Sequence, residues 1–191
     1  MQRTAVASTS TRFPTGLSSA WLARRWYYTP RSHRAYSVRQ ISPGDRRLLA
    51  EFTLSLTQAA AERDQQGMRC LSGILFDRVI VSDGGDTAVG FAALENTAAG
   101  DRVIGISAYA PSSQENADFI VAVANSYREE QVGRTLLSTL LRHAKRVGVR
   151  RLTGEMCWSN RPMQMLAMSM GFVVEPLPRD RNMRRLMLAL K

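Results

Sequence analysis

The sequence predicts an α/β fold built on a mixed, mostly antiparallel sheet. Three short apolar runs follow one another over about 87–94, 102–110 and 117–124, and turns rich in Gly and Asp separate them. This pattern is typical of an antiparallel meander. The third run leads through a polar turn into an amphipathic helix, expected over about 132–147. With 191 residues, of which 45% are hydrophobic, the chain can bury the core of one domain.

Local signals predict the other elements. Alternation of apolar and polar residues indicates a first strand at 36–41, and Ser42 followed by Pro43 favours a helix start after it. Asn160 is a candidate helix cap, and Gly171 a candidate helix end. The remaining elements are expected as a helix at about 45–56, a less regular helix or loop at 57–73, a strand at 149–157, and closing strands at 172–175 and 183–190.

Residues 1–35 differ in composition from the rest of the chain. They are rich in Ser, Thr, Ala and Arg and contain no Asp or Glu. We interpret them as a disordered basic N-terminal extension that precedes a domain at 36–191. A mitochondrial transit peptide has the same composition. Because nearly all basic residues are Arg, as in GC-rich bacterial genomes, we expect a cytoplasmic bacterial protein, with mitochondrial import as the alternative.

The net charge of +10 does not by itself predict nucleic-acid binding. Seven of the 26 basic residues lie within 1–39 without an acidic residue, which leaves 19 basic against 16 acidic residues in the rest of the chain. The folded part is therefore not expected to bind nucleic acid. No apolar run approaches the ~20 residues of a membrane span, and the two cysteines and two histidines have no metal-ligand spacing.

The turn between the third apolar run and the central helix is a candidate anion site. It carries Arg128 and Gly133, and the first backbone N–H groups of the helix have no partner within the helix. Together with the positive end of the helix dipole, these groups favour a phosphate. Gly133 has no side chain that would keep a phosphate from the backbone.

The segment Arg128-x-x-Gln131-x-Gly133 resembles the pyrophosphate-binding motif of the GNAT acyltransferase superfamily, (Arg/Gln)-x-x-Gly-x-(Gly/Ala). In that family the loop binds the pyrophosphate of acetyl-coenzyme A, and helices flank the central sheet on both faces. Gln131 stands where the family usually has Gly, and a Gln disfavours a positive φ.

Two further segments carry the resemblance. Gly154-Glu-Met-Cys-Trp-Ser-Asn160-Arg-Pro-Met163, followed by Met170-Gly171-Phe172, is similar to Gly-Glu-Val-x-x-x-Asn-x-x-Met…Leu-Gly-Phe in the GNAT domain of bacterial protein-lysine acetyltransferases. Gly105-Ile-Ser-Ala-Tyr109 and Ala117-Asp118-Phe119 look like Gly-Val-Ala-Arg-Tyr and Ala-Glu-Phe of the same subgroup. The resemblance covers about residues 36–190, with the three motifs in the family's order.

The resemblance implies where acetyl-coenzyme A would bind. In the family, the strand before the phosphate loop diverges from the next strand, and the pantetheine arm enters the gap. Asn160 would contact this arm, cap its helix, or do both. The residues implied to bind the cofactor are Ile120, Val121, Ala122, Val123, Arg128, Glu129, Glu130, Gln131, Val132, Gly133, Arg134, Thr135, Asn160 and Met163.

The resemblance also implies an acid–base chemistry. Asp118 matches the Glu of Ala-Glu-Phe and is the candidate general base, although an Asp entering a strand is often only a solvated turn residue. Glu155, on the neighbouring strand, is the second candidate. Ala167 stands where many GNAT enzymes have a Tyr that protonates the leaving thiolate.

Two functions follow as expectations. The first is an N-acetyltransferase that moves an acetyl group from acetyl-coenzyme A to a primary amine, on a protein lysine or a small molecule. The alternative is a non-catalytic, acyl-coenzyme A-binding regulatory module. No metal is expected, and relatives of this type are monomers or homodimers.

Overall fold

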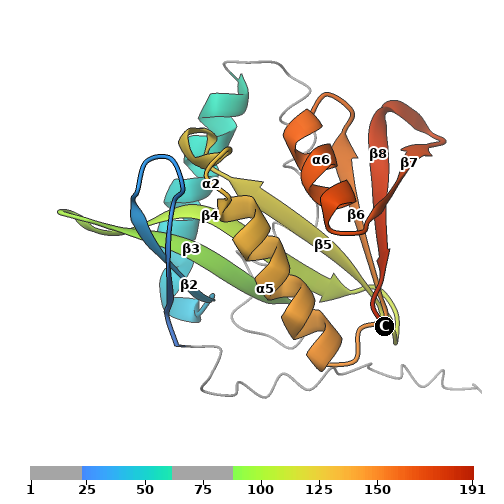
Figure 1. Ribbon diagram of the computed structural model, residues 1–191, viewed down its shortest axis with the longest axis horizontal. Helices are drawn as coiled ribbons and strands as arrows, with labels where there is room; N and C mark the ends of the chain where they lie inside the picture. The colour runs from blue at the N-terminus through green and yellow to red at the C-terminus, as the bar shows by residue number, and fades with distance from the viewer. Residues whose placement is uncertain (1–22, 62–87) are drawn as a thin grey trace, which may run out of the picture.

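The computed structural model describes residues 23–61 and 88–191, which form one eight-stranded sheet with helices on both faces (Figure 1). The strand order is β1-β2-β3-β4-β5-β6-β8-β7. Neighbouring strands are antiparallel, except for β5 and β6, which are parallel. The strands are β1 (Arg25–Tyr28), β2 (Ala35–Gln40), β3 (Val89–Thr97), β4 (Gly100–Pro111), β5 (Asn116–Val123), β6 (Arg151–Cys157), β7 (Val173–Leu177) and β8 (Asp180–Ala189).

Helices α2 (Arg46–Ala61) and α5 (Val132–Arg146) cover opposite faces of the sheet (Figure 1). Alternate residues of β3 show this directly, because Phe91 and Ala93 pack in the cluster that contains α5, whereas Ala92 and Leu94 pack with α2. Helix α6 (Arg161–Ser169) lies beside β6 and β7. The short 3₁₀ turns are η1 (Pro43–Asp45) and η2 (Asn125–Tyr127). The predicted α/β class, with a mixed and mostly antiparallel sheet, is confirmed.

The apolar face of α5 forms the centre of the larger core. Its residues with no exposed surface recur at helical spacing, as the sequence predicted: Val132, Leu136, Leu137, Leu140 and Ala144. Burying a leucine of this kind stabilises the fold by about 1.5–3 kcal/mol relative to leaving it exposed. The position of α5 on the sheet, and with it the position of its N-terminus, is therefore strongly determined.

The N-terminal boundary differs from the one expected at residue 36. Residues 25–28 form β1, which pairs with β2 in the register Arg25↔Val38 to Tyr28↔Ala35. Tyr27 stacks on Tyr36, with ring centroids 5.5 Å apart. The aromatic residues Trp26, Tyr27 and Tyr28 favour a strand, but they lie in a segment whose overall Ser, Thr and Arg content is typical of a disordered extension.

Other boundaries differ by a few residues. Helix α2 continues to Ala61, five residues beyond its predicted end, and the rest of the helix or loop expected over 57–73 lies outside the described residues, as does the start of the strand expected at Thr87. The strand expected from Val149 begins at Arg151, because the Val149 N–H still bonds the Ala144 carbonyl at the end of α5 (3.0 Å).

A buried carboxylate fixes the connection between β2 and α2. Asp45 is 4% exposed and accepts two hydrogen bonds of 2.6 Å from the Arg39 guanidinium. It also accepts from the backbone N–H of Ser42 (2.8 Å) and from its hydroxyl (2.9 Å). Burial alone would raise the pKa of Asp45, but the hydrogen bonds from Arg39 and Ser42 outweigh it and hold the pKa below its ordinary value.

This network predicts an acid-sensitive contribution to stability. A lowered pKa in the folded state stabilises the fold above the unfolded pKa of about 3.9, and the effect is lost as pH falls through the folded pKa. Asp45→Asn should therefore lower the free energy of unfolding by about 2 kcal/mol at pH 7, and by less as the pH falls below about 4. Urea denaturation of both proteins across this range measures the difference, and a constant difference contradicts the assignment.

Candidate functional site

Strands β5 and β6 diverge shortly after they meet. Their ladder consists of the pairs Asn116↔Arg151, Ala117↔Leu152 and Asp118↔Thr153. Strand β5 then continues to Val123 and remains paired with β4 on its other side. Between the two described strands, no ladder pair follows Asp118. The edge of β5 that carries residues 120–123 therefore faces a gap in the sheet, as the sequence analysis expected.

An aromatic pair lies where the strands separate. A Cβ at Gly154 would lie 2.7 Å from the Phe119 ring, so this position of β6 accommodates the ring only because it is glycine. Phe119 also packs against Phe172, with ring centroids 5.1 Å apart. The bulk of Phe119 at the end of the ladder thus accompanies the loss of pairing between β5 and β6.

The two candidate carboxylates lie on one face of the sheet. Asp118 is in register with Thr153, and Glu155 follows two residues later, so the parallel ladder directs both carboxylates to the same side. Both residues are exposed. Ile120 and Ala122 share this face and pack with the cluster that contains α2. Asp118 and Glu155 thus lie on neighbouring strands at the start of the gap, on the face opposite α5.

The loop at the end of β5 leads directly into α5. It passes through η2, and Gln131 then adopts a left-handed conformation with φ 58° and ψ 5° immediately before the helix begins at Val132. A positive φ is uncommon for residues other than glycine. The position at which the family motif has Gly therefore has the backbone conformation that glycine favours, although this chain carries Gln there.

The predicted cofactor residues of the loop fall into an exposed and a buried group. The exposed members are Arg128, Glu129, Gln131 and Arg134, and the buried members are Glu130, Val132 and Gly133. Arg134 donates a hydrogen bond to the Ser169 hydroxyl of α6 (2.7 Å). Thr135 bonds the Tyr36 hydroxyl (2.9 Å), which links α5 to β2.

Gly133 has a packing role that the sequence analysis did not anticipate. A Cβ at this position would lie 3.3 Å from the end of the Leu166 side chain and 3.5 Å from Val123. Glycine at 133 therefore lets α5 approach both α6 and the end of β5. The expectation that Gly133 leaves room for a phosphate stays a prediction.

Asn160 caps α6, as predicted. Its side-chain oxygen accepts a hydrogen bond from the Met163 N–H (3.2 Å). Asn160 is exposed and Met163 is half-buried. A contact of either residue with a cofactor arm stays a prediction.

Sequence reasoning missed a polar cluster that holds the start of the loop. The buried Tyr127 hydroxyl donates to Glu95 (2.6 Å) and accepts from Arg34 (3.0 Å) and Arg102 (3.1 Å). Burial alone would raise the pKa of Glu95, but its bonds with Tyr127 and Arg102 outweigh burial and lower it. These three partners lie 25 to 93 residues from Tyr127, so no local pattern indicates them.

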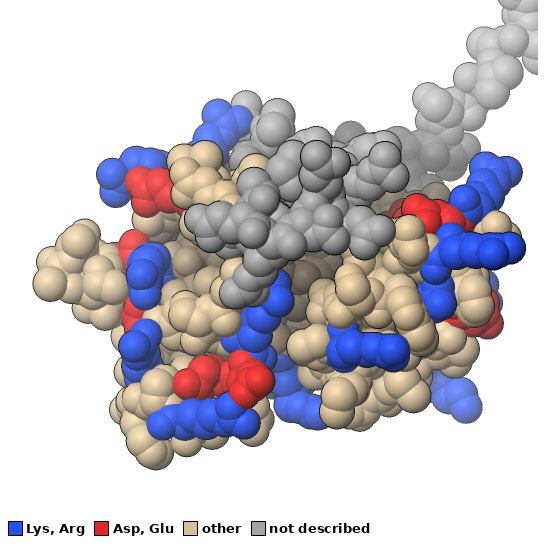
Figure 2. All heavy atoms as spheres, turned by 90° about the horizontal axis from the view of Figure 1, so that it is seen from above, with Lys and Arg blue, Asp and Glu red and all other residues tan. Residues whose placement is uncertain are grey.

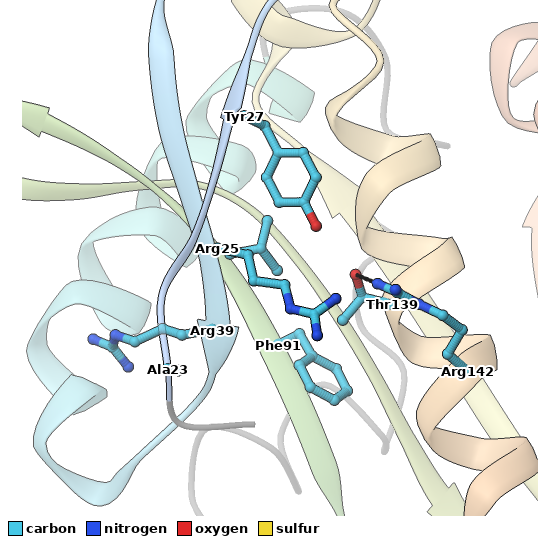
Figure 3. A pocket seen from close by; sticks show the side chains of 8 residues that line it. Ala23, Arg25, Tyr27, Arg39, Phe91, Thr139 and Arg142 are labelled. Atoms are coloured by element: carbon cyan, nitrogen blue, oxygen red, sulfur yellow. Dashed lines mark hydrogen bonds between the residues drawn. The ribbon is translucent and has the colours of Figure 1, made fainter. Parts of the chain in front are cut away.

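A separate hollow lies between β1 and the middle of α5 (Figure 3). It is small, with a volume of about 10 Å³. Arg25 points into it, whereas Arg39 turns away toward Asp45. Arg142 donates to the Thr139 hydroxyl at 3.3 Å. Thr139 lies about two turns beyond the start of α5, so this hollow is distinct from the loop and the gap.

Neither a metal nor a membrane is indicated within residues 23–61 and 88–191. This part of the chain holds no group of three or more His, Cys, Asp or Glu side chains placed to bind an ion. None of its helices has the length and apolarity of a membrane span.

His143 is buried and bonds the Tyr109 hydroxyl (2.8 Å). Basic and acidic side chains are interspersed over the face shown in Figure 2.

Comparison with solved structures gives the same fold. The GNAT domain of S. lividans PAT superposes with a TM-score of 0.64 at 18% identity, over 91% of this chain and 99% of that one. An acetyltransferase of the GNAT family from Streptococcus pneumoniae gives 0.63 at 18% identity, over 82% and 99%. The cAMP-binding acyltransferase from Mycobacterium smegmatis gives 0.60 at 17% identity, over 91% of this chain but only 49% of that protein.

No curated protein matches the sequence. The family model described as "Acetyltransferase (GNAT) family" matches residues 55–172, which is more than half of the chain. This match agrees with the diverging strands, the loop before α5 and the solved relatives. The chain belongs to the GNAT acetyltransferase family.

Proposed function

We propose that this protein transfers an acetyl group from acetyl-coenzyme A to a primary amine. The observation that carries the proposal is the gap between β5 and β6, which opens at Asp118 and ends at the N-terminus of α5. Family membership makes acyl transfer the first expectation for such a gap. The geometry supplies a polar strand edge for a thioester and a helix end for phosphates.

The co-substrate fits the residues of this chain as follows. The pyrophosphate would bind the first N–H groups of α5, with Arg128 and Arg134 as nearby cations. Glu129 and Glu130 lie in the same loop, and as carboxylates they would accept no bond from phosphate oxygens. The thioester arm would lie along the edge of β5 that faces the gap, where the backbone N–H groups of Val121 and Val123 are directed away from β4.

The reaction requires proton transfer from the amine. A lysine or similar amine has a pKa of about 10.4 and is mostly protonated near pH 7. Asp118 would remove the proton, directly or through one water, and the amine would then attack the thioester carbonyl. The carbon–sulfur bond then breaks, and the thiolate can leave without a general acid because the pKa of a free thiol is only about 8.5; solvent protonates it afterwards. Ala167 stands where many GNAT enzymes have a Tyr, and because its side chain has no ionisable group it supplies no acid.

The acceptor is proposed to approach the face that carries Asp118 and Glu155. The resemblance of three sequence motifs to those of bacterial protein-lysine acetyltransferases favours a protein lysine as the acceptor, and a small-molecule amine is the alternative. A metal is not needed for this chemistry. We further propose a cytoplasmic monomer or homodimer that does not bind nucleic acid.

A non-catalytic acyl-coenzyme A-binding module is the second candidate. Gln131 in place of Gly and Asp118 in place of Glu are the departures from the family motifs that favour it. The similarity to a cAMP-binding acyltransferase shows that a GNAT fold can occur in a longer protein that also binds a second ligand. Binding without transfer to any amine would distinguish this candidate from the enzyme.

The first prediction concerns binding. Acetyl-coenzyme A should raise the melting temperature of the native protein, because a ligand at 100 times its Kd stabilises the fold by about 2.7 kcal/mol. Gly133→Leu should weaken binding, measured by calorimetry, because the larger side chain must displace Leu166 or enter the gap. Gly44→Leu, on η1, where the nearest atom to a Cβ is 3.9 Å away, is the control. A folded Gly133→Leu protein with native affinity contradicts the site.

The second prediction concerns the base. Asp118→Asn should lower the rate of transfer at least tenfold, since general-base catalysis typically contributes about 10²–10⁴-fold. Affinity for acetyl-coenzyme A should hardly change, because the pyrophosphate contacts lie on α5. Glu155→Gln in the same assay ranks the two carboxylates. Full turnover by Asp118→Asn together with loss in Glu155→Gln would identify Glu155 as the base.

The third prediction concerns the left-handed residue. Gln131→Gly should give a free energy of unfolding about 1 kcal/mol higher than Gln131→Ala, because only glycine adopts a positive φ without a Cβ penalty. The same pair of changes at Gln164, within α6, should give the opposite order by a similar amount. Urea denaturation of the four variants tests this, and the same order at both positions would show that Gln131 is not strained.

A further inference from the structure

We propose that the turn between β1 and β2, residues 29–34, is part of the cofactor site, and that Glu130 positions the phosphate-binding loop by attaching it to this turn. The inference rests on the proposed function and deepens it. It assigns a role in donor selection to a segment that precedes the recognised motifs in the chain, and it makes Glu130 a positioning residue rather than a ligand of the cofactor.

The attachment uses both oxygens of the Glu130 carboxylate. The Arg31 N–H donates to one oxygen (3.0 Å), and the Ser32 N–H donates to the other (3.1 Å). Glu130 is only 8% exposed, although it lies in a surface loop. Figure 1 shows the β1–β2 turn beside the segment that precedes α5. Two consecutive backbone N–H groups directed at one carboxylate form a specific anion-binding arrangement.

The turn itself is built to present these donors. The Thr29 N–H bonds the Arg34 carbonyl (2.9 Å), and the Thr29 hydroxyl accepts from the Arg34 N–H (2.8 Å). The same hydroxyl bonds that of Ser32 (2.7 Å), and Thr29 is 1% exposed. His33 adopts a positive φ of 51° and donates its N–H to the Thr29 carbonyl (3.1 Å). The donors for Glu130 are therefore held by hydrogen bonds within the turn itself.

The contacts also change the charge that a phosphate would meet. Two adjacent carboxylates, Glu129 and Glu130, would repel a pyrophosphate at the start of α5. Glu130 is turned into the β1–β2 turn, and Glu129 forms an ion pair with the Arg31 side chain. The turn thus engages both carboxylates of the loop.

The same turn fixes the conformation of the loop on both sides of Arg128. Arg34 donates to the Tyr127 hydroxyl (3.0 Å) before it, and Arg31 and Ser32 hold Glu130 after it. The next residue is Gln131 with its positive φ. A strained residue of this kind persists only where its surroundings determine its conformation. We infer that the attachment of Glu130 maintains the left-handed turn from which α5 and its free N–H groups begin.

The attachment of Glu130 should matter only for the binding of donors that carry a pyrophosphate. Acetyl-coenzyme A would use the loop, whereas acetyl-pantetheine has the same thioester and arm but no pyrophosphate. Glu130→Ala should raise the KM and Kd for acetyl-coenzyme A about tenfold and leave the KM for acetyl-pantetheine and the kcat for both donors nearly unchanged. Glu130→Gln should give a smaller increase than Glu130→Ala. Its carbonyl oxygen can keep the bond with one N–H group, whereas the amide NH₂ that replaces the other oxygen cannot accept from the second.

Asp45→Ala is the matched control in full-length protein. Asp45 is also a buried carboxylate that accepts from a backbone N–H and is paired with an arginine, but on η1. Asp45→Ala should lower stability without changing the ratio of the KM for acetyl-coenzyme A to the KM for acetyl-pantetheine. An unchanged ratio in both Glu130 variants, or equal weakening of both donors, overturns the positioning role. Equal affinity of the unmutated protein for acetyl-coenzyme A and acetyl-pantetheine also overturns the positioning role. Native protein that binds neither donor overturns the proposed function itself.

Discussion

The structure depends on the end of the ladder between β5 and β6. Up to Asp118 these strands form part of a continuous sheet, and beyond it β4 is the only described strand that pairs with β5. Phe119 occupies the point of separation because Gly154 leaves room for its ring. Without this separation the sheet would offer no polar edge in its interior, and the N-terminus of α5 would end beside a closed surface. The candidate site is thus a consequence of backbone hydrogen bonds that are not made.

The rest of the fold holds the two borders of that gap in place. Helix α5 is anchored by a row of fully buried residues, which fixes its N-terminus at the end of β5. Gly133 allows α6 to approach closely through Leu166. At the loop, the cluster around Tyr127 and the attachment of Glu130 join three segments that are distant in sequence. The apolar packing of α5 and the polar contacts of the preceding loop therefore fix the same stretch of backbone at the start of α5.

The elements with strong local periodicity could be predicted from the sequence, and those formed by distant partners could not. The face of α5, the Asn160 cap and the strand order around β4 follow from spacing and capping chemistry. Strand β1 was missed because four residues within a basic, Ser-rich segment carry little periodic signal. The positive φ at Gln131 was indicated by the family motif alone. The partners of Glu130 and Tyr127 are 25 to 99 residues away, so only tertiary structure places them.

The single parallel contact among the described strands also divides the sheet. Strands β1 to β5 pair in chain order, and β6, β8 and β7 form a second set of neighbours. Each set is held by antiparallel pairs, whereas the junction between the sets consists of only three parallel residue pairs. The sheet is therefore expected to open first at this junction in native-state hydrogen exchange.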